Sequence, residues 1–309
     1  MSTLRRFGGG GPAIPPLILG GNVFGWTADR ATSFAILDAF VAGGGRMVDT
    51  ADVYSAWAPG NEGGESESII GDWLVKRGRS GDVLIATKVG AQGGLSAANI
   101  EVRVNASLKR LRVDWVDLLY AHKDDQDTPL EETLEAFERL VRAGKARMLG
   151  ASNYSGSRLE AAAKVAERLH LTGYSVLQTN YSLLHRPELE SDLLVVARRR
   201  NIDICAYYAL ASGYLTGKYR NKEDLSKSPR GAGVRKYMES NGPSVLAALG
   251  QIASRTGHTL AQVALAWVAV KIAAPIASAT SVSQVEELLG AMSLQLTDEQ
   301  VAILDSAST

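Results

Sequence analysis

Eight short apolar runs alternate with longer amphipathic stretches in this chain, and that alternation most constrains its fold. Several runs are apolar at consecutive positions, which is typical of strands buried on both faces of a parallel sheet. The runs are LILGG (17–21), RMVDT (46–50), VLIATK (83–88), VDLLYAH (116–122), ARMLGAS (146–152), SVLQTN (175–180), IDICAYY (202–208) and APIAS (274–278). The amphipathic stretches lie near 29–43, 65–77, 96–111, 129–143, 155–169, 187–200, 259–271 and 281–292.

A chain of 309 residues could form two ordinary domains or one large barrel. Eight strand–helix units predict an α/β fold with one domain over 1–309, a (β/α)8 TIM barrel. A doubly wound sheet with extra strands is the alternative. The glycines and prolines of residues 1–14 predict a flexible lead-in.

Two features lie outside the eight strand–helix units. The stretch 209–258 holds a long Gly/Ser/Arg-rich connection after the seventh strand and an extra helix near 243–256. A C-terminal helix is predicted after Thr297, where Thr297 and Gln300 have the spacing of a capping box, as Thr259 and Gln262 do earlier. Long loops in compact domains are commonly functional, and the pattern leaves the structure of 220–242 open.

Charge and composition exclude several classes of protein. Because 33 Lys+Arg balance 33 Asp+Glu, neither nucleic acid nor an anionic membrane surface is an expected partner. The single cysteine, Cys205, excludes an internal disulfide and fits a reducing compartment. The most apolar region, 259–279, is broken by Lys271 and Pro275, and no apolar stretch follows Arg5 as in a signal peptide. We therefore expect a cytoplasmic protein, and the sequence leaves its oligomeric state open.

Three ionisable residues stand at equivalent positions of neighbouring predicted strands. Asp49, Lys88 and His122 end the second, third and fourth strands, and Tyr54 follows Asp49 by five residues. Any one of them alone is commonly a capping or packing residue. Four at matching depth favour a site, because catalytic side chains of parallel barrels gather at the carboxyl ends of the strands.

These residue types suit carbonyl reduction. A phenol has a pKa of about 10, and we expect the Lys88 ammonium to lower that pKa while Asp49 keeps the ammonium charged. A neutral imidazole at His122 could orient a carbonyl. A redox cofactor would then supply the hydride. The alternative is an aldolase that forms a Schiff base on Lys88, and no metal is expected, since the four histidines lack ligand spacing.

Longer motifs around these residues resemble the aldo-keto reductase family over nearly the whole chain. They are MVDTADVYS from 47, LIATKVG from 84, VDLLYAHKDDQDTPLEETLEAFERLVRAGKARMLGASNYS from 116, QTNYSLLHR from 178, LASGYLTGKY from 210 and TLAQVALAWV from 259. The resemblance implies a (β/α)8 barrel that binds NADPH or NADH without a Rossmann fold. It implies that Tyr54 is the proton donor, that Lys88 and Asp49 tune it, and that His122 orients the carbonyl.

The resemblance also implies a cofactor site. Its residues would hold the nicotinamide amide (Ser152, Asn153, Gln178), the nicotinamide ring (Tyr207), the pyrophosphate (Leu210, Ser212, Leu215, Gly217, Lys218) and the adenosine (Ser278, Thr280, Gln284, Glu287, Leu288), with Gly21 and Asn22 beside them. Asn22, Trp57 and Tyr208 are expected at the substrate mouth.

One position departs from the family pattern. Thr280 stands where an Arg usually pairs with the 2′-phosphate of the adenosine, and Leu288 replaces a usual Asn. A hydroxyl cannot replace a bidentate guanidinium on phosphate. NADP(H) is expected by family habit, and Thr280 makes NAD(H) plausible.

The sequence therefore predicts an NAD(P)H-dependent oxidoreductase that reduces aldehydes or ketones to alcohols, with a small-molecule carbonyl as its substrate. The alternative within the same fold is a non-catalytic or slow redox-sensing regulatory subunit. The sequence does not identify the physiological carbonyl.

Overall fold

Eight parallel strands close into a barrel, as the sequence predicts. The structure is a computed structural model that describes residues 4–78 and 81–309; residues 1–3 of the predicted lead-in lie outside the described part. The closed order is β10-β3-β4-β5-β6-β7-β8-β9. The strands are β3 (Ile18–Gly20), β4 (Met47–Asp49), β5 (Leu84–Val89), β6 (Val116–Ala121), β7 (Ala146–Ser152), β8 (Val176–Asn180), β9 (Asp203–Tyr207) and β10 (Ala274–Ala277).

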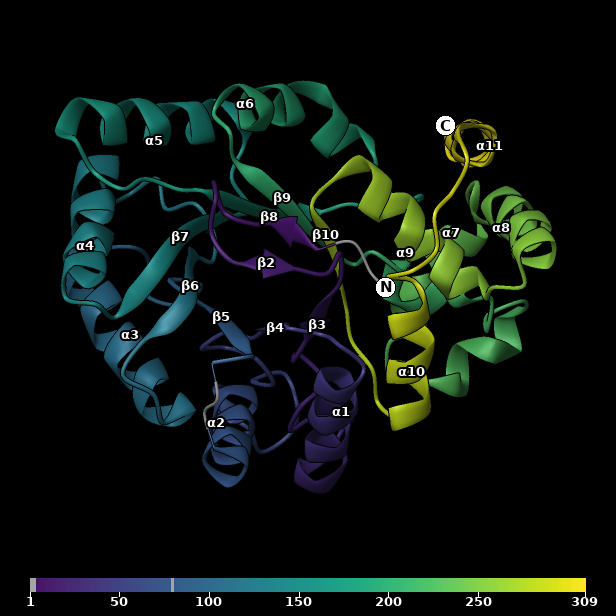
Figure 1. Cartoon of the computed structure of the whole chain (residues 1–309), viewed down its shortest axis with the longest axis horizontal. Coiled ribbons are helices and arrows are strands. Elements are labelled where there is room, and N and C mark those ends of the chain that lie inside the picture. The colour runs from purple at the N-terminus through teal and green to yellow at the C-terminus, as the bar shows by residue number, and fades with distance from the viewer. Residues whose placement is uncertain (1–3, 79–80) are drawn as a thin grey trace.

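Helices surround the barrel and join successive strands (Figure 1). They are α1 (Arg30–Ala42), α2 (Glu65–Arg77), α3 (Ala97–Leu111), α4 (Leu130–Arg142), α5 (Gly156–Leu169), α6 (Leu194–Arg199), α9 (Leu260–Lys271) and α10 (Val282–Gly290). The predicted capping box at the start of α9 is present, since the side chains of Thr259 and Gln262 exchange bonds with each other's backbone N–H groups. The predicted helix at 187–200 is interrupted: a single wide turn covers Leu189–Leu193, and Ser191 leaves helical geometry with ψ −119° before α6 begins.

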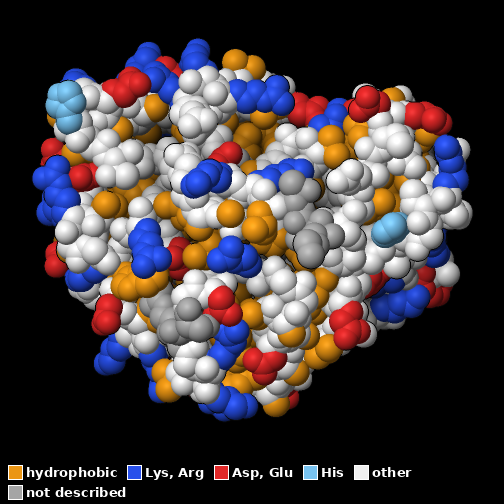
Figure 2. Space-filling model, in the orientation of Figure 1, with side chains coloured by type: hydrophobic (Ala, Val, Ile, Leu, Met, Phe, Trp, Pro, Cys, Tyr) orange, Lys and Arg blue, Asp and Glu red, His pale blue; other side chains and the backbone are white. Residues whose placement is uncertain are grey.

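The core has two layers. Inside the barrel, residues such as Met47, Leu118 and Val176 pack together, while Val48, Leu119 and Leu177 from the same strands face the helices. Because neighbouring residues point to opposite faces of a strand, both layers require apolar side chains. This explains why several of the eight runs do not alternate between apolar and polar residues. Outside the core, basic and acidic side chains are interspersed over the face drawn in Figure 2.

A hairpin closes the amino-terminal end of the barrel, where the sequence predicts a flexible lead-in. Strands β1 (Arg5–Arg6) and β2 (Ala13–Ile14) pair antiparallel and cross the barrel in Figure 1. Phe7 and Ile14 are buried in the inner layer, and the N–H of Gly8 donates to Asp203 Oδ2 at 2.8 Å. The glycine run forms the turn of this hairpin, because Gly8, Gly9 and Gly10 have φ of 72°, 69° and 104°. The prediction of a flexible lead-in is therefore wrong for residues 5–14.

The long connection after β9 covers the opposite, carboxyl end. It contains short 3-10 turns at Ala211–Thr216, Lys222–Lys227 and Gly231–Val234, the short helix α7 (Arg235–Met238) and then α8 (Gly242–Thr256). The terminal helix α11 (Asp298–Ala307) starts with the predicted Thr297–Gln300 capping box and packs against α8. The stretch left open by the sequence, 220–242, is thus built from short turns above the strand ends.

Candidate active site

Strand register brings Asp49 and Lys88 to the same end of the barrel. Asp49 is the last residue of β4 and pairs with Ala86, and Lys88 pairs with Tyr120 on the next strand. His122 follows β6 directly, and its backbone N–H donates to the carbonyl of Val89 at 2.8 Å. The three strand-end residues therefore meet as predicted.

The loop after β4 brings Tyr54 back to these residues. The loop turns tightly, because the N–H of Tyr54 donates to the carbonyl of Ala51 at 3.1 Å. Ser55 has a left-handed φ of 71°, and its buried hydroxyl donates to the carbonyl of Phe24 at 2.7 Å. A non-glycine residue held in this region indicates a backbone fixed by its surroundings. The loop therefore presents the Tyr54 ring in one orientation.

A hydrogen-bond network joins the phenol to the buried lysine. Lys88 Nζ donates to Asp49 Oδ2 at 2.7 Å, to Tyr54 Oη at 2.8 Å and to the carbonyl of Thr50 at 2.8 Å. Tyr54 Oη donates to Asp49 Oδ2 at 3.3 Å, and Gln178 Nε2 donates to Asp49 Oδ1 at 2.9 Å. All three protons of the ammonium are used, and the lysine side chain is 1% exposed. This arrangement argues against a Schiff-base nucleophile, which must reach a carbonyl as a free amine.

The resting phenol is a weaker acid than the sequence led us to expect. Burial raises the pKa of Tyr54 well above its ordinary value, and the Asp49 carboxylate raises it further. Burial also lowers the pKa of Lys88, and Asp49 opposes that change. Because Asp49 balances the lysine charge at 2.7 Å, the ammonium does not produce the expected lowering of the Tyr54 pKa. The phenol keeps its proton at neutral pH, as a proton donor must.

His122 lies beside the phenol as a neutral imidazole. Its ring centroid is 6.2 Å from that of Tyr54. Burial, and then the positive charges of Lys88 and Lys123, lower the pKa of His122 to about 3. Its Nδ1 atom is buried and has no hydrogen-bond partner among the described residues. The ring is therefore uncharged at physiological pH, in agreement with its predicted orienting role.

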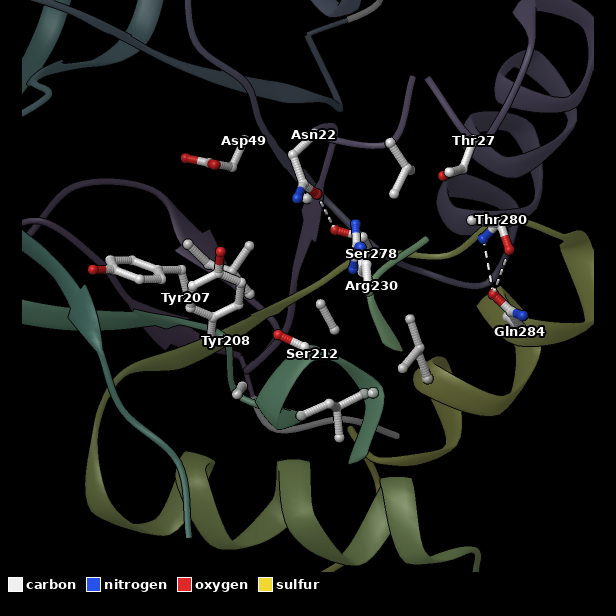
Figure 3. A pocket seen from close by; sticks show the side chains of 18 of the residues that line it. Asn22, Thr27, Asp49, Tyr207, Tyr208, Ser212, Arg230, Ser278, Thr280 and Gln284 are labelled. Carbon is white, nitrogen blue, oxygen red and sulfur yellow. Dashed lines mark hydrogen bonds between the residues drawn. The ribbon is translucent and has the colours of Figure 1, made fainter. Parts of the chain in front are cut away.

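A cavity of about 760 Å³ runs from Asp49 and Tyr54 to Thr280 and Gln284. Figure 3 shows two contacts that shape it: Ser278 Oγ donates to Asn22 Oδ1 at 2.5 Å, and the Thr280 hydroxyl donates to Gln284 Oε1 at 3.2 Å. Tyr207 is fixed at the inner end, where its hydroxyl donates to Asn153 Oδ1 at 2.7 Å. This volume lies within the range of small-molecule and cofactor sites, about 300–1,000 Å³.

Most residues named from the sequence line this cavity. They are Asn22, Asp49, Tyr54, Trp57, His122, Ser152, Asn153, Gln178, Tyr207, Tyr208, Leu210, Ser212, Lys218, Ser278, Thr280, Gln284, Glu287 and Leu288. Lys88 lies beneath Tyr54 rather than in the lining. Three more residues do not line it, and their predicted roles stay predictions: Gly21 packs against the hydroxyl of Ser66, Leu215 is fully buried, and Gly217 has a left-handed φ of 78°.

Thr27 and Arg230 also line the cavity, and sequence reasoning missed both. Thr27 Oγ1 and Arg230 Nη2 are buried without a hydrogen-bond partner among the described residues. The guanidinium of Arg230 lies 5.4 Å from the ring centroid of Trp26. Buried donors normally have a hydrogen-bond partner, so these two atoms fit a polar, anionic ligand. Arg230 lies in the long connection after the seventh strand, which the sequence marks as a candidate functional loop without singling out this residue, and no sequence pattern singles out Thr27.

The fold and the site together define a (β/α)8 barrel with a buried Asp–Lys–Tyr network and a neutral histidine at the carboxyl end of its strands. Comparison with known sequences agrees. The sequence model of the aldo/keto reductase family matches residues 16–309, and the chain belongs to that family.

Several relatives match at similar levels. An aldo-keto reductase AFTS1 of Alternaria alternata is 31% identical over 99% of this chain and 92% of its own length. An uncharacterized oxidoreductase YrpG of Bacillus subtilis is 33% identical over 96% of this chain and 92% of its own. A probable voltage-gated potassium channel subunit beta of Arabidopsis thaliana is 33% identical over 93% of this chain and 90% of its own. No helix within the described residues is long and apolar enough to cross a membrane.

Proposed function

We propose that this protein reduces aldehydes or ketones to alcohols with NADPH or NADH. The observation that carries the proposal is the network in which Lys88 Nζ lies 2.8 Å from Tyr54 Oη and 2.7 Å from Asp49 Oδ2 at the inner end of the cavity. The lining residues Ser152, Asn153 and Gln178 offer the amide and hydroxyl groups that would hold a nicotinamide. When bound, the dinucleotide supplies a hydride to the carbonyl carbon.

The residues of this chain supply the proton and stabilise the charge. As the carbonyl oxygen gains negative charge, Tyr54 gives it the phenolic proton and becomes a phenolate. Lys88 Nζ, already donating to that oxygen at 2.8 Å, stabilises the phenolate. The neutral imidazole of His122 orients the carbonyl without competing for the proton. A proton from solvent then restores the phenol and completes the cycle.

The experiment is reduction of a simple aldehyde by the wild type and by Tyr54→Phe, with NADPH and NADH binding followed by protein fluorescence. General acid catalysis accelerates reactions on the order of 10²–10⁴-fold. The kcat of Tyr54→Phe should therefore decrease by a factor of that order, while the Kd of the cofactor changes little. Tyr174→Phe is a matched control. It removes a buried hydroxyl that lies 3.2 Å from Tyr154 Oη, and neither residue lines the cavity. Full activity in Tyr54→Phe would reject the donor role, and lack of binding by either nucleotide would reject the cofactor.

The same fold supports a second function, a redox-sensing regulatory subunit that turns over slowly. The relative named as a probable potassium channel subunit beta, matched over 93% of this chain, favours this candidate. Turnover distinguishes the two functions. If the cofactor binds tightly but no tested carbonyl oxidises it, the result supports the regulatory subunit. If an aldehyde is reduced over multiple turnovers, the result supports the reductase.

A further inference from the structure

A buried carboxylate on the Tyr54 loop takes no part in the network described above. Asp52 lies between Asp49 and Tyr54 in sequence, and its side chain is fully buried. Neither Oδ1 nor Oδ2 has a hydrogen-bond partner among the described residues. Buried carboxylates are normally hydrogen-bonded or closely paired, so this group needs an explanation.

The nearest cation holds Asp52 by charge alone. Arg103 of α3 approaches with its Nε atom 3.6 Å from Asp52 Oδ2, beyond a hydrogen bond. Arg103 is itself fixed, because its Nη2 donates to Gln92 Oε1 at 2.7 Å. An attraction without a hydrogen bond depends on the carboxylate being ionised. Protonation of Asp52 would therefore release this contact.

The other charged groups around Asp52 act on its pKa in opposite directions. Glu67 on α2 repels it, while Arg110 on α3 and Lys88 on β5 attract it more weakly than Arg103 does. Glu67 is already paired with Arg110 at 2.7 Å. Burial is the largest influence and raises the pKa of Asp52 to about 6. The ionisation state of Asp52 therefore changes just below neutral pH.

The backbone at Asp52 connects this contact to the catalytic network. The N–H of Asp52 donates to the carbonyl of Lys88 at 3.1 Å, and Lys88 Nζ donates to the carbonyl of Thr50 at 2.8 Å. Tyr54 follows two residues later, and its backbone N–H donates to the carbonyl of Ala51. The segment from Asp49 to Tyr54 is thus held by Lys88 on one side and by Arg103 on the other.

We propose that Asp52, held in ionised form by Arg103, is a positioning residue that fixes the Tyr54 loop against Lys88 and makes hydride-coupled protonation sensitive to mild acid. The proposal rests on the proposed reductase function, because Tyr54 is the group being positioned. Asp52 touches neither substrate nor cofactor. It acts through the loop, so its loss lowers kcat more than it changes the KM for the carbonyl.

Four variants test the proposal through the pH profile of kcat between pH 4.5 and 8. In the wild type kcat should fall about tenfold through a midpoint near pH 6 and level off at the value of Asp52→Asn, because the protonated carboxyl no longer attracts Arg103. Asp52→Asn should remove this acid limb and lower kcat at pH 7 about tenfold, since misplacement by 1 Å can cost about 100-fold. Arg103→Gln should lower kcat and remove the acid limb as Asp52→Asn does, because the loop loses its attachment at every pH, and Arg103→Lys should restore both. Arg112→Gln removes an ion pair of the residue that follows α3, with Asp72 of α2 at 2.7 Å, and should leave the profile unchanged.

A second measurement does not depend on turnover. With tyrosine labelled at ¹³Cζ, the Tyr54 resonance, assigned by Tyr54→Phe, should shift through the same midpoint in the wild type and stay constant in Asp52→Asn. A Tyr54 resonance that ignores pH between 4.5 and 8, or an acid limb that persists in Asp52→Asn, would overturn the proposal. If no carbonyl is reduced but the resonance titrates as described, the reductase function fails while the positioning role of Asp52 stands.

Discussion

At the scale of single residues, the end of the cavity at Thr280 is where the proposed cofactor would place its adenosine. Thr280 donates through its N–H and its hydroxyl to Gln284 Oε1, at 2.8 and 3.2 Å, and Glu287 also lines this end. None of these three side chains carries positive charge to meet a 2′-phosphate. The neighbourhood therefore suits free ribose hydroxyls at least as well as a phosphate.

Replacing Thr280 by Arg tests this interpretation. A charge-assisted pair of hydrogen bonds is worth about 1.5–3 kcal/mol, so Thr280→Arg should tighten NADPH relative to NADH on the order of tenfold or more. Kd values from fluorescence titration at fixed ionic strength measure the ratio. Val102→Arg is the control, because Val102 is 67% exposed on α3 and does not line the cavity. An unchanged ratio in Thr280→Arg would show that the phosphate lies elsewhere.

The protonation of His122 gives a second prediction at this scale. With its pKa lowered to about 3 by burial and by Lys88, His122 should remain neutral from pH 8 down to about pH 4. Ring ¹³C–¹H spectra, with the His122 resonance assigned by His122→Asn, would show that this ring does not titrate in this window. Titration of His122 near pH 6.5 would instead make it a candidate proton donor.

Residue positions were predictable where strand ends define them. Asp49, Lys88 and His122 follow from counting strands, and Tyr54 follows from its distance to Asp49 along the chain. The raised pKa of Tyr54 was not predictable, because it depends on how completely Asp49 balances Lys88 in space. Arg230 was missed for a related reason: its place above Trp26 is set by the tertiary path of a long loop.

At the scale of elements, the amino-terminal hairpin stabilises the barrel by covering one end of its interior. Phe7 is 1% exposed and Ile14 is 1% exposed among the inner-layer side chains. Arg46 Nη1 adds a bond to the carbonyl of Ala13 at 3.0 Å. The sequence suggested flexibility because glycines dominate residues 8–11. The two buried side chains that decide the outcome are isolated in sequence and find partners only in the closed barrel.

Phe7→Ala should therefore destabilise the whole protein. Replacing a buried Phe by Ala typically costs about 3–5 kcal/mol, and the free energy of unfolding from urea denaturation should fall by about that amount. Leu4→Ala, at a side chain 53% exposed, is the control and should change stability by less than about 0.5 kcal/mol. Equal stabilities of Phe7→Ala and the wild type would mean that the hairpin detaches without cost.

Helical elements were predicted more fully than the hairpin, since periodicity and capping are local. Thr259 and Thr297 cap α9 and α11 as their sequences indicate. The break at Ser191 has no such local signal, because the nearest Gly or Pro is Pro187, which precedes it in the chain. Local chemistry thus fixes where most helices start, whereas packing decides where one of them bends.

At the scale of the whole molecule, Asp52 and His122 have opposite effects on how stability depends on pH. The folded state raises the pKa of Asp52 from 3.8 to about 6 and lowers that of His122 from 6.5 to about 3. Between pH 6 and 4 the folded protein holds the Asp52 proton more tightly than the unfolded chain does, so acid stabilises the fold through Asp52. The unfolded chain holds the His122 proton more tightly between pH 6.5 and 3, so acid destabilises the fold through His122.

Asp52→Asn isolates the first of these terms. A shift of about two pKa units corresponds to on the order of 2–3 kcal/mol. The free energy of unfolding of the wild type, relative to Asp52→Asn, should therefore fall by that order as pH rises from 4 to 7, and urea denaturation at several pH values measures it. A relative stability that is flat or rises over this range would contradict a buried, poorly paired carboxylate. The expected result separates stability from catalysis, because protonation of Asp52 then strengthens the fold under the same conditions in which the Tyr54 loop loses its attachment to Arg103.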